Sequence, residues 1–288
     1  MEYLIHLGIL IAIYVILGIS LNLVVGYTGL LSMAQAAFYG IGAYTTAIFL
    51  VSFKFNFFLS VIAGIIITAV LSLIIGLVLS KFNNDYYVFG SSGFTVIIYS
   101  VLLNWQKLTR GPLGISGIKR PEIFGFSFDQ NIHFLLLVVV VAILVYFLAR
   151  FITGSSFGRV LKAIREDEKA IQVFGYNTLY FKLMIFIIGA CLASVAGSFF
   201  ASYISYVSPL SFSLAESVFI LAIIIMGGLA NNKGTVIGAI FLIILPEILR
   251  FVGFPNNVAA QMRQATYGLI LILLMLYRPH GFMGEYRL

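Results

Sequence analysis

The sequence predicts an all-α polytopic membrane protein, a bundle of about eight to ten transmembrane helices. The first reason is composition: 61% of the 288 residues are hydrophobic and 9% are charged, and the mean hydropathy is +1.09. A soluble globule of this size needs a largely polar coat, which so few polar side chains cannot provide. The second reason is that the apolar residues form continuous runs of about the 20 residues that cross a bilayer. These runs lack the alternation of a membrane β-barrel, so backbone groups pair within helices.

Nine apolar segments are expected as helices, separated by short polar breaks. In chain order they are 3–25, 30–51, 57–80, 86–104, 132–149, 181–206, 213–230, 235–252 and 265–277. The first begins after Glu2 without a basic region or a small-residue cleavage site, so we expect a retained helix and not a signal peptide. The second is rich in Gly, Ser and Gln, which is compatible with a broken or re-entrant helix. The last is short.

Two polar stretches are too long to be simple turns, and together with the apolar segments they belong to a single transmembrane domain, 1–288. Residues 105–131 contain the Gly- and Pro-rich sequence RGPLGISGIKRPE and are expected to form a loop. Residues 150–180 are the other stretch. One predicted helix separates the two, so they should face opposite sides of the membrane. A modest excess of Lys and Arg places 150–180 in the cytoplasm and 105–131 outside. The net charge of +7 then reflects lipid headgroups and topology instead of nucleic acid.

Residues 158–175, GRVLKAIREDEKAIQVFG, are referred to below as the charged segment because they combine three acids with four bases. Their apolar residues follow helical spacing, which predicts an amphipathic helix of about four turns. Gly158 should precede this helix, and Gly175 should follow it as a left-handed C-cap. An interfacial helix resting in the headgroups is the simpler interpretation. The consecutive acids 166–168 fit a protein partner better than an anionic surface.

The charged segment resembles the cytoplasmic coupling helix of LivM-type membrane subunits of branched-chain amino acid ABC importers. Further stretches resemble the same family in order along nearly the whole chain: GYTGLLSMAQAAFYGIGAY (26–44), TRGPLGISGI (109–118), YISYVSPLSFSLAESV (203–218), MGGLANNKGTVIGA (226–239) and YRPHGFMG (277–284). The resemblance implies that the charged segment docks in a groove of a separate ATPase. It assigns this coupling role to Gly158, Arg159, Arg165, Glu166, Asp167, Glu168 and Gly175.

The same resemblance implies a set of partners and a location. The partners are a second, homologous LivH-like permease subunit, two cytoplasmic ABC ATPase subunits and an extracytoplasmic substrate-binding protein. The location is the cytoplasmic membrane of a bacterium or archaeon. The implied cargo is leucine, isoleucine or valine, although urea and short-chain amide permeases share much of the pattern. A secondary transporter or channel that works without ATP is a further alternative.

The chain is expected to have no enzymatic activity and no cofactor of its own. It contains no G-x-x-x-x-G-K-[ST] motif that could cradle ATP phosphates, so ATP should bind to partner subunits. Its three His residues are isolated and it has one Cys, so no metal cluster of the usual spacing is predicted. No paired catalytic residues occur within the apolar runs.

Polar residues inside apolar runs are the candidates for the translocation route, because unsatisfied polar groups are costly in hydrocarbon. They are Ser32, Gln35, Tyr39, Tyr44 and Glu216.

Small residues also recur every four positions in two segments. These are Gly189, Ala193, Gly197 and Ala201 in one, and Ser32, Ala36 and Gly40 in the other. Such faces favour close helix packing, and a sliding contact during transport is the alternative.

Overall fold

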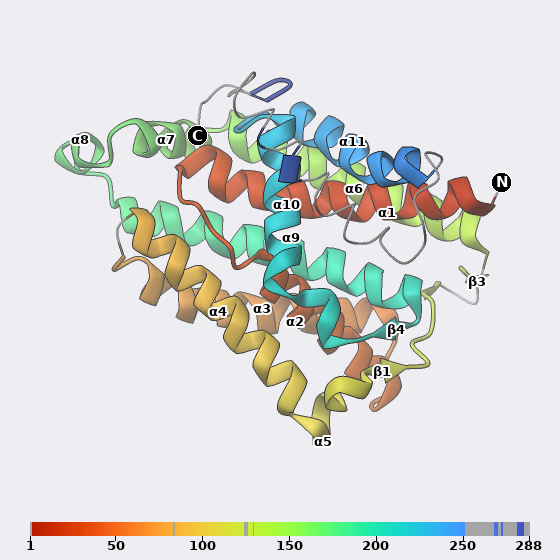
Figure 1. Cartoon of the computed structure of the whole chain (residues 1–288). Coiled ribbons are helices and arrows are strands. Elements are labelled where there is room, and N and C mark those ends of the chain that lie inside the picture. The colour runs from red at the N-terminus through yellow and green to blue at the C-terminus, as the bar shows by residue number, and fades with distance from the viewer. Residues whose placement is uncertain are drawn as a thin grey trace.

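The computed structural model describes residues 2–82, 84–123, 126–128, 130–250, 268–269, 272 and 281–284. Figure 1 shows a layer of long helices with short elements at both ends. Among these residues, five helices are long and apolar enough to cross a membrane, and three shorter apolar helices accompany them. The chain is therefore an all-α polytopic membrane protein, as predicted. The ninth predicted segment, 265–277, lies outside the described residues apart from 268–269 and 272.

The long helices agree with the predicted segments to within a few residues. They are α1 (Glu2–Leu21), continued by the π-helix η1 (Asn22–Gly26), α3 (Phe57–Leu79), α4 (Asn84–Asn104), α6 (Asn131–Gly154) and α9 (Thr178–Ile204). The shorter apolar helices are α2 (Gln35–Val51), α10 (Leu214–Gly227) and α11 (Asn232–Arg250).

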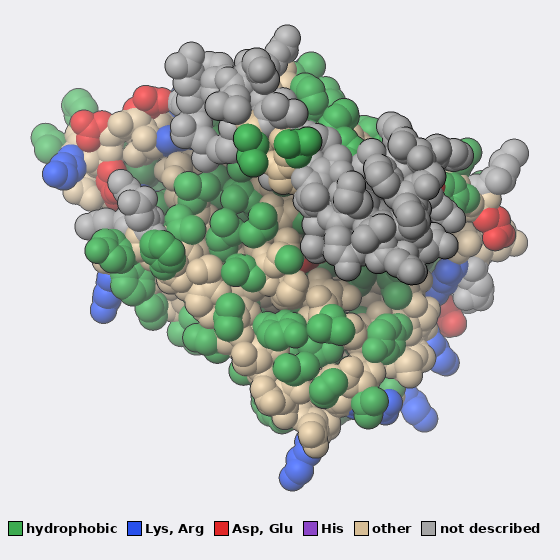
Figure 2. All heavy atoms as spheres, in the orientation of Figure 1, with side chains coloured by type: hydrophobic (Ala, Val, Ile, Leu, Met, Phe, Trp, Pro, Cys, Tyr) green, Lys and Arg blue, Asp and Glu red, His purple; other side chains and the backbone are tan. Residues whose placement is uncertain are grey.

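Burial divides the long helices into two groups. More than half of the most apolar window of α1 and of α9 is buried, against 28% for α3, α4 and α6. The two central helices run in opposite directions in Figure 1 and contact each other. In Figure 2 hydrophobic side chains cover the middle of the visible face, and charged side chains lie at its edges. This pattern fits a helical layer whose middle faces lipid, because charged groups are costly there.

The two polar stretches lie at opposite ends of α6, as predicted (Figure 1). Residues 105–131 carry α5 (Gln106–Thr109), the 3₁₀-helix η2 (Gly111–Leu113) and three short strands, β1 (Ile115–Ser116), β2 (Glu122–Ile123) and β3 (Phe126–Ser127). β1 pairs antiparallel with β4 (Tyr206–Val207), and β2 pairs with β3. The other stretch carries α7 (Ser156–Glu166) and α8 (Glu168–Val173).

The second predicted segment, 30–51, is helical only from Gln35 onward. Residues 29–34 form no helix, and the first of them, Gly29, has a φ of +75°, which turns the chain back. The helix is therefore shorter than the predicted segment. The predicted small-residue face of this segment is wrong at Ser32, which precedes the helix, whereas Ala36 and Gly40 lie on α2.

The small-residue face of α9 packs against the chain, as its sequence predicted. Gly189, Ala193, Gly197 and Ala201 are all buried. A Cβ on Gly197 would overlap the main-chain oxygen of Tyr39 on α2. In return, a Cβ on Gly42 of α2 would overlap the main-chain oxygen of Ser194 on α9. Without a hydrophobic drive between helices in lipid, such close approach supplies the attraction.

Candidate coupling and translocation sites

The charged segment begins within α7, which a serine cap and a buried apolar edge hold in place. Ser155 is the N-cap residue, and its Oγ accepts a hydrogen bond of 3.4 Å from the Gly158 amide. Leu161 is fully buried, and Ile164 is 4% exposed. The predicted amphipathic helix is thus present, with its apolar edge against the membrane-spanning helices.

The prediction of one continuous helix between Gly158 and Gly175 is wrong. The helix breaks at Asp167, whose φ and ψ of −153° and 99° are extended. The Asp167 carboxylate accepts a 3.0 Å hydrogen bond from the Ala170 amide and so caps α8. An Asp side chain competes with the helix for backbone donors and therefore favours a cap over a helix interior.

The two predicted glycine positions have different outcomes. Gly158 lies inside α7 and does not precede it. A Cβ there would overlap the main-chain oxygen of Thr153, so close backbone approach accounts for this glycine. Gly175 follows α8 with a φ of +86°, the left-handed conformation expected after a helix.

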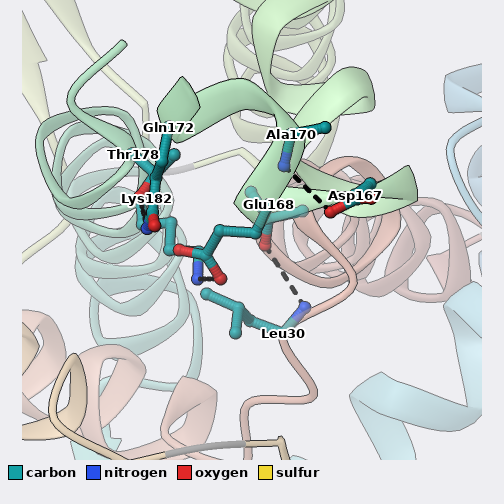
Figure 3. Close-up of polar contacts among 8 residues, drawn as sticks. Leu30, Asp167, Glu168, Ala170, Gln172, Thr178 and Lys182 are labelled. Carbon is teal, nitrogen blue, oxygen red and sulfur yellow. Dashed lines mark hydrogen bonds and ion pairs between the residues drawn. The ribbon is translucent and has the colours of Figure 1, made fainter. Parts of the chain in front are cut away.

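Three contacts tie the charged segment to the membrane-spanning helices. Arg165 donates from Nη1 to the main-chain carbonyl of Gly26, at the end of η1. Lys182, in the first turns of α9, forms an ion pair with Glu168, and Gln172 donates to Thr178 Oγ1 at 3.0 Å. Figure 3 shows the last two contacts, with Glu168 and Gln172 of α8 reaching toward α9. The segment is thus attached to both central helices.

A polar cavity of about 550 Å³ separates the break in the charged segment from the end of α1. It is lined by Thr28, Gly29, Arg165, Asp167, Glu168 and Lys182, among others. Gly29 packs closely against the Arg165 side chain, since a Cβ there would lie 3.2 Å from Arg165 Cγ. The cavity therefore lies where the chain turns from η1 toward α2.

Other residues of the charged segment face away from the helical layer. Arg159 and Glu166 are exposed, and Arg159 donates to Ser156 Oγ at 2.9 Å. Val173 and Phe174 at the end of α8 are 88% and 77% exposed. The apolar residues of the charged segment therefore do not share one buried face, since Leu161 is buried and Phe174 is exposed.

The five residues predicted for the translocation route lie on three elements near the middle of the layer. Gln35 begins α2 and donates from Nε2 to Ser20 Oγ of α1. Tyr39 and Tyr44 on α2 both pack on the ring of Phe212, with ring centroids 5.0 and 6.0 Å away.

Ser32 and Glu216 are placed differently from each other. Ser32 Oγ accepts a 3.3 Å hydrogen bond from the Ala34 amide, so it shapes the turn before α2. Glu216, in the first turn of α10, accepts a 2.6 Å hydrogen bond from the Tyr14 hydroxyl of α1. The structure thus brings Gln35, Tyr39 and Glu216 to the place where α1, α2 and α10 meet.

Sequence reasoning missed several polar residues that connect these elements. Ser217 accepts a 3.0 Å hydrogen bond from the Ala36 amide and so joins α10 to α2. Asn22, fully buried in η1, accepts from the Ala230 amide at 3.0 Å and ties α1 to the turn before α11. Asn22 is a polar residue in an apolar run, as Gln35 is, and Ser217 directly follows Glu216.

A family model described as branched-chain amino acid transport system / permease component matches residues 3–277. The chain belongs to this family. It is 31% identical to the high-affinity branched-chain amino acid transport system permease protein LivM of Escherichia coli (strain K12), over 97% of this chain and 69% of the relative. No solved structure gives a significant match.

Other members of the permease family are more distant. The probable LivM protein of Methanocaldococcus jannaschii is 25% identical over 78% of this chain and 68% of its own length. The permease protein LivH of Escherichia coli (strain K12) is 24% identical over 94% of this chain and 91% of its own length. Membership makes this chain a transport permease component.

Proposed function

We propose that this chain is the membrane-spanning permease subunit of an ABC importer that carries leucine, isoleucine and valine into the cell. The observation that carries this proposal is the match of nearly the whole chain to the permease family and to LivM relatives from bacteria. The chain would lie in the cytoplasmic membrane of a bacterium or archaeon as one domain, 1–288. Residues 150–180 would face the cytoplasm and 105–131 the outside.

The permease would work within a larger assembly. Similarity to LivH proteins over 94% of the chain supports a related permease subunit as its membrane partner. Two cytoplasmic ABC ATPases would bind ATP, and an extracytoplasmic binding protein would deliver the substrate. The chain itself would need no cofactor, since its sequence has no phosphate-binding loop.

Movement of the ATPases would be transmitted to the charged segment, and from there to α1 and α9 through its contacts with these helices. Arg165 holds the end of η1, and Glu168 holds the first turns of α9. A shift of α7 and α8 would therefore move both central helices. Because only residues 27–28 separate η1 from residues 29–34, the same shift would reach the start of α2 and its polar contacts with α1 and α10.

The outward residues of the charged segment would form the ATPase contact. Val173 and Phe174 are the most exposed apolar residues there, and Arg159 and Glu166 stand nearby in sequence as charged groups. Large apolar side chains that fill a partner's pocket, surrounded by polar groups, are typical of interface hot spots.

Co-purification of the ATPase subunits with the permease tests this assignment. Phe174→Ala should reduce ATPase recovery about tenfold or more, the loss expected for a hot-spot residue. Phe151→Ala is the matched control, because Phe151 is equally exposed, at 77%, but lies on α6. Equal recovery with Phe174→Ala and wild type would contradict the docking role.

Uptake into vesicles that contain the whole assembly tests the substrate. Radiolabelled leucine should accumulate only when ATP is supplied on the cytoplasmic side. Accumulation of urea without leucine would instead favour an amide permease, and uptake driven by an ion gradient without the ATPases would favour a secondary transporter.

A further inference from the structure

Two parts of the chain have the same order of elements and run in opposite directions. In the first, α1 and η1 are followed by the non-helical residues 29–34 and the short helix α2. In the second, α9 is followed by residues 205–213, which contain only β4 and a 3₁₀ turn, and the short helix α10. In each part, the segment between the long and the short helix begins at a residue with a left-handed backbone conformation, Gly29 or Ser205. The two parts are thus arranged like an inverted repeat, whose halves cross the membrane in opposite directions. In such repeats a short helix can begin inside the membrane.

The two short helices begin side by side, where the Ala36 amide of α2 donates to Ser217 Oγ of α10. The depth of this point follows from α1. Tyr14, which donates to Glu216, is twelve residues from each end of the span Glu2–Gly26. At 1.5 Å per residue it lies about 18 Å from either end. The carboxylate of Glu216 is thus held near the middle of the bilayer.

Glu216 receives its hydrogen bond from a neutral hydroxyl. Within the described part of the chain, no Lys or Arg forms an ion pair with Glu216. The N-terminal turn of α10 supplies a partial positive charge, which favours the carboxylate but does not neutralise it. A carboxylate at this depth without a cation is costly. Glu216 is also only half-buried, so a ligand can reach it.

Tyr39 provides an independent sign of a ligand. Its side chain is 1% exposed, and its hydroxyl has no hydrogen-bond partner among the described residues. Tyr39 lies one helical turn after Ala36 on α2, and the Ala36 amide contacts Ser217, the residue that follows Glu216. Buried hydroxyls nearly always have a partner, and a missing partner calls for an explanation such as an absent ligand.

We propose that Glu216, Tyr14 and Tyr39 form a mid-membrane site for the ammonium group of an amino acid. The ammonium would donate to the Glu216 carboxylate and to the Tyr39 hydroxyl, and Tyr14 would hold the carboxylate in position. The ammonium would supply both the missing cation and the missing partner. This inference rests on the proposed function, because it assumes that an amino acid passes through the chain.

Leucine uptake at saturating binding protein tests the site in vesicles that contain the complete assembly. Glu216→Gln should lower the maximal rate at least tenfold, and Glu216→Asp should recover part of it. Tyr39→Phe should lower the rate at least threefold. Glu2→Gln and Tyr86→Phe are matched controls, since Glu2 and Tyr86 are exposed, and both should transport like wild type.

The melting temperature of the purified assembly separates binding from structure. Removing an unpartnered buried hydroxyl costs no hydrogen bond, so Tyr39→Phe should melt at the wild-type temperature or above it while it transports more slowly. A parallel fall of melting temperature and uptake in Glu216→Gln and Tyr39→Phe would indicate a structural role and overturn the site, as would wild-type rates in both. If the wild-type assembly itself imports no leucine, the proposed function fails and the site falls with it.

Discussion

Arg165 of the charged segment donates from Nη1 to the main-chain carbonyl of Gly26, the last residue of η1. This contact joins two parts of the chain that are 139 residues apart. It reaches the point where α1 ends and the chain turns back toward α2. A movement of α7 therefore acts on residues 27–34, which lead to the place where α1, α2 and α10 meet.

Arg165→Ala should uncouple ATP hydrolysis from uptake. Leucine uptake should fall at least fivefold while the ATPase subunits stay bound, because the lost contact is with Gly26 and not with the ATPase. The two quantities are measured on one preparation, as uptake into vesicles and as ATPase recovered with the permease. Arg159→Ala is the matched control on the same helix, since Arg159 contacts Ser156 within α7. It should weaken ATPase binding instead.

The ion pair of Lys182 and Glu168 should contribute to coupling more than to stability. The two side chains are 18% and 38% exposed, and a pair so open to solvent contributes about 0.2–1 kcal/mol. Lys182→Glu alone should reduce uptake several-fold through repulsion. The exchange Lys182→Glu with Glu168→Lys should restore at least half of it. A double-mutant cycle on the uptake rates measures the interaction between the two side chains. No recovery of uptake in the exchanged pair would argue against a role for the ion pair in coupling.

Gly42→Ala should destabilise the contact between α2 and α9, because the added Cβ overlaps the main chain of Ser194. Overpacking of this kind costs about 1–3 kcal/mol. Gly93→Ala on α4 is the control, since a Cβ there meets nothing within 4 Å. The melting temperature in detergent should fall for Gly42→Ala alone. Equal values for the two variants would contradict the packing described for α2 and α9.

Asp167→Ala should loosen α8, because it removes the carboxylate that caps this helix. Loss of such a cap costs about 1 kcal/mol, so amides of residues 168–173 should exchange with solvent about fivefold faster. Hydrogen exchange followed by mass spectrometry measures this rate. Glu166→Ala, which removes an exposed acid outside the cap, should leave exchange in α8 unchanged.

Much of the fold was predictable because lipid imposes a simple rule on sequence. Continuous apolar runs located α1, α3, α6 and α9, since each must pair its backbone within one helix. The same rule does not predict at which depth in the membrane a short helix begins. The start of α2 at Gln35 and of α10 at Leu214 depends on tertiary contacts such as Ala36 with Ser217, which no local pattern contains.

The candidate sites were predictable in part for the same reason. Gln35, Tyr39 and Glu216 were found as polar residues in apolar runs, and the structure brings them together. Tyr14 and Ser217 carry the same signal and were overlooked. The break at Asp167 was missed because helical periodicity continues across it, while the deciding interaction is a cap to the Ala170 amide.

Leucine uptake by vesicles that contain this chain, with and without its ATPase partners, tests whether the charged segment transmits force from ATP hydrolysis on a separate subunit. We expect uptake only when the ATPases and ATP are both present, and loss of that uptake in Arg165→Ala. Full-rate uptake by the chain alone, without nucleotide, would contradict this coupling.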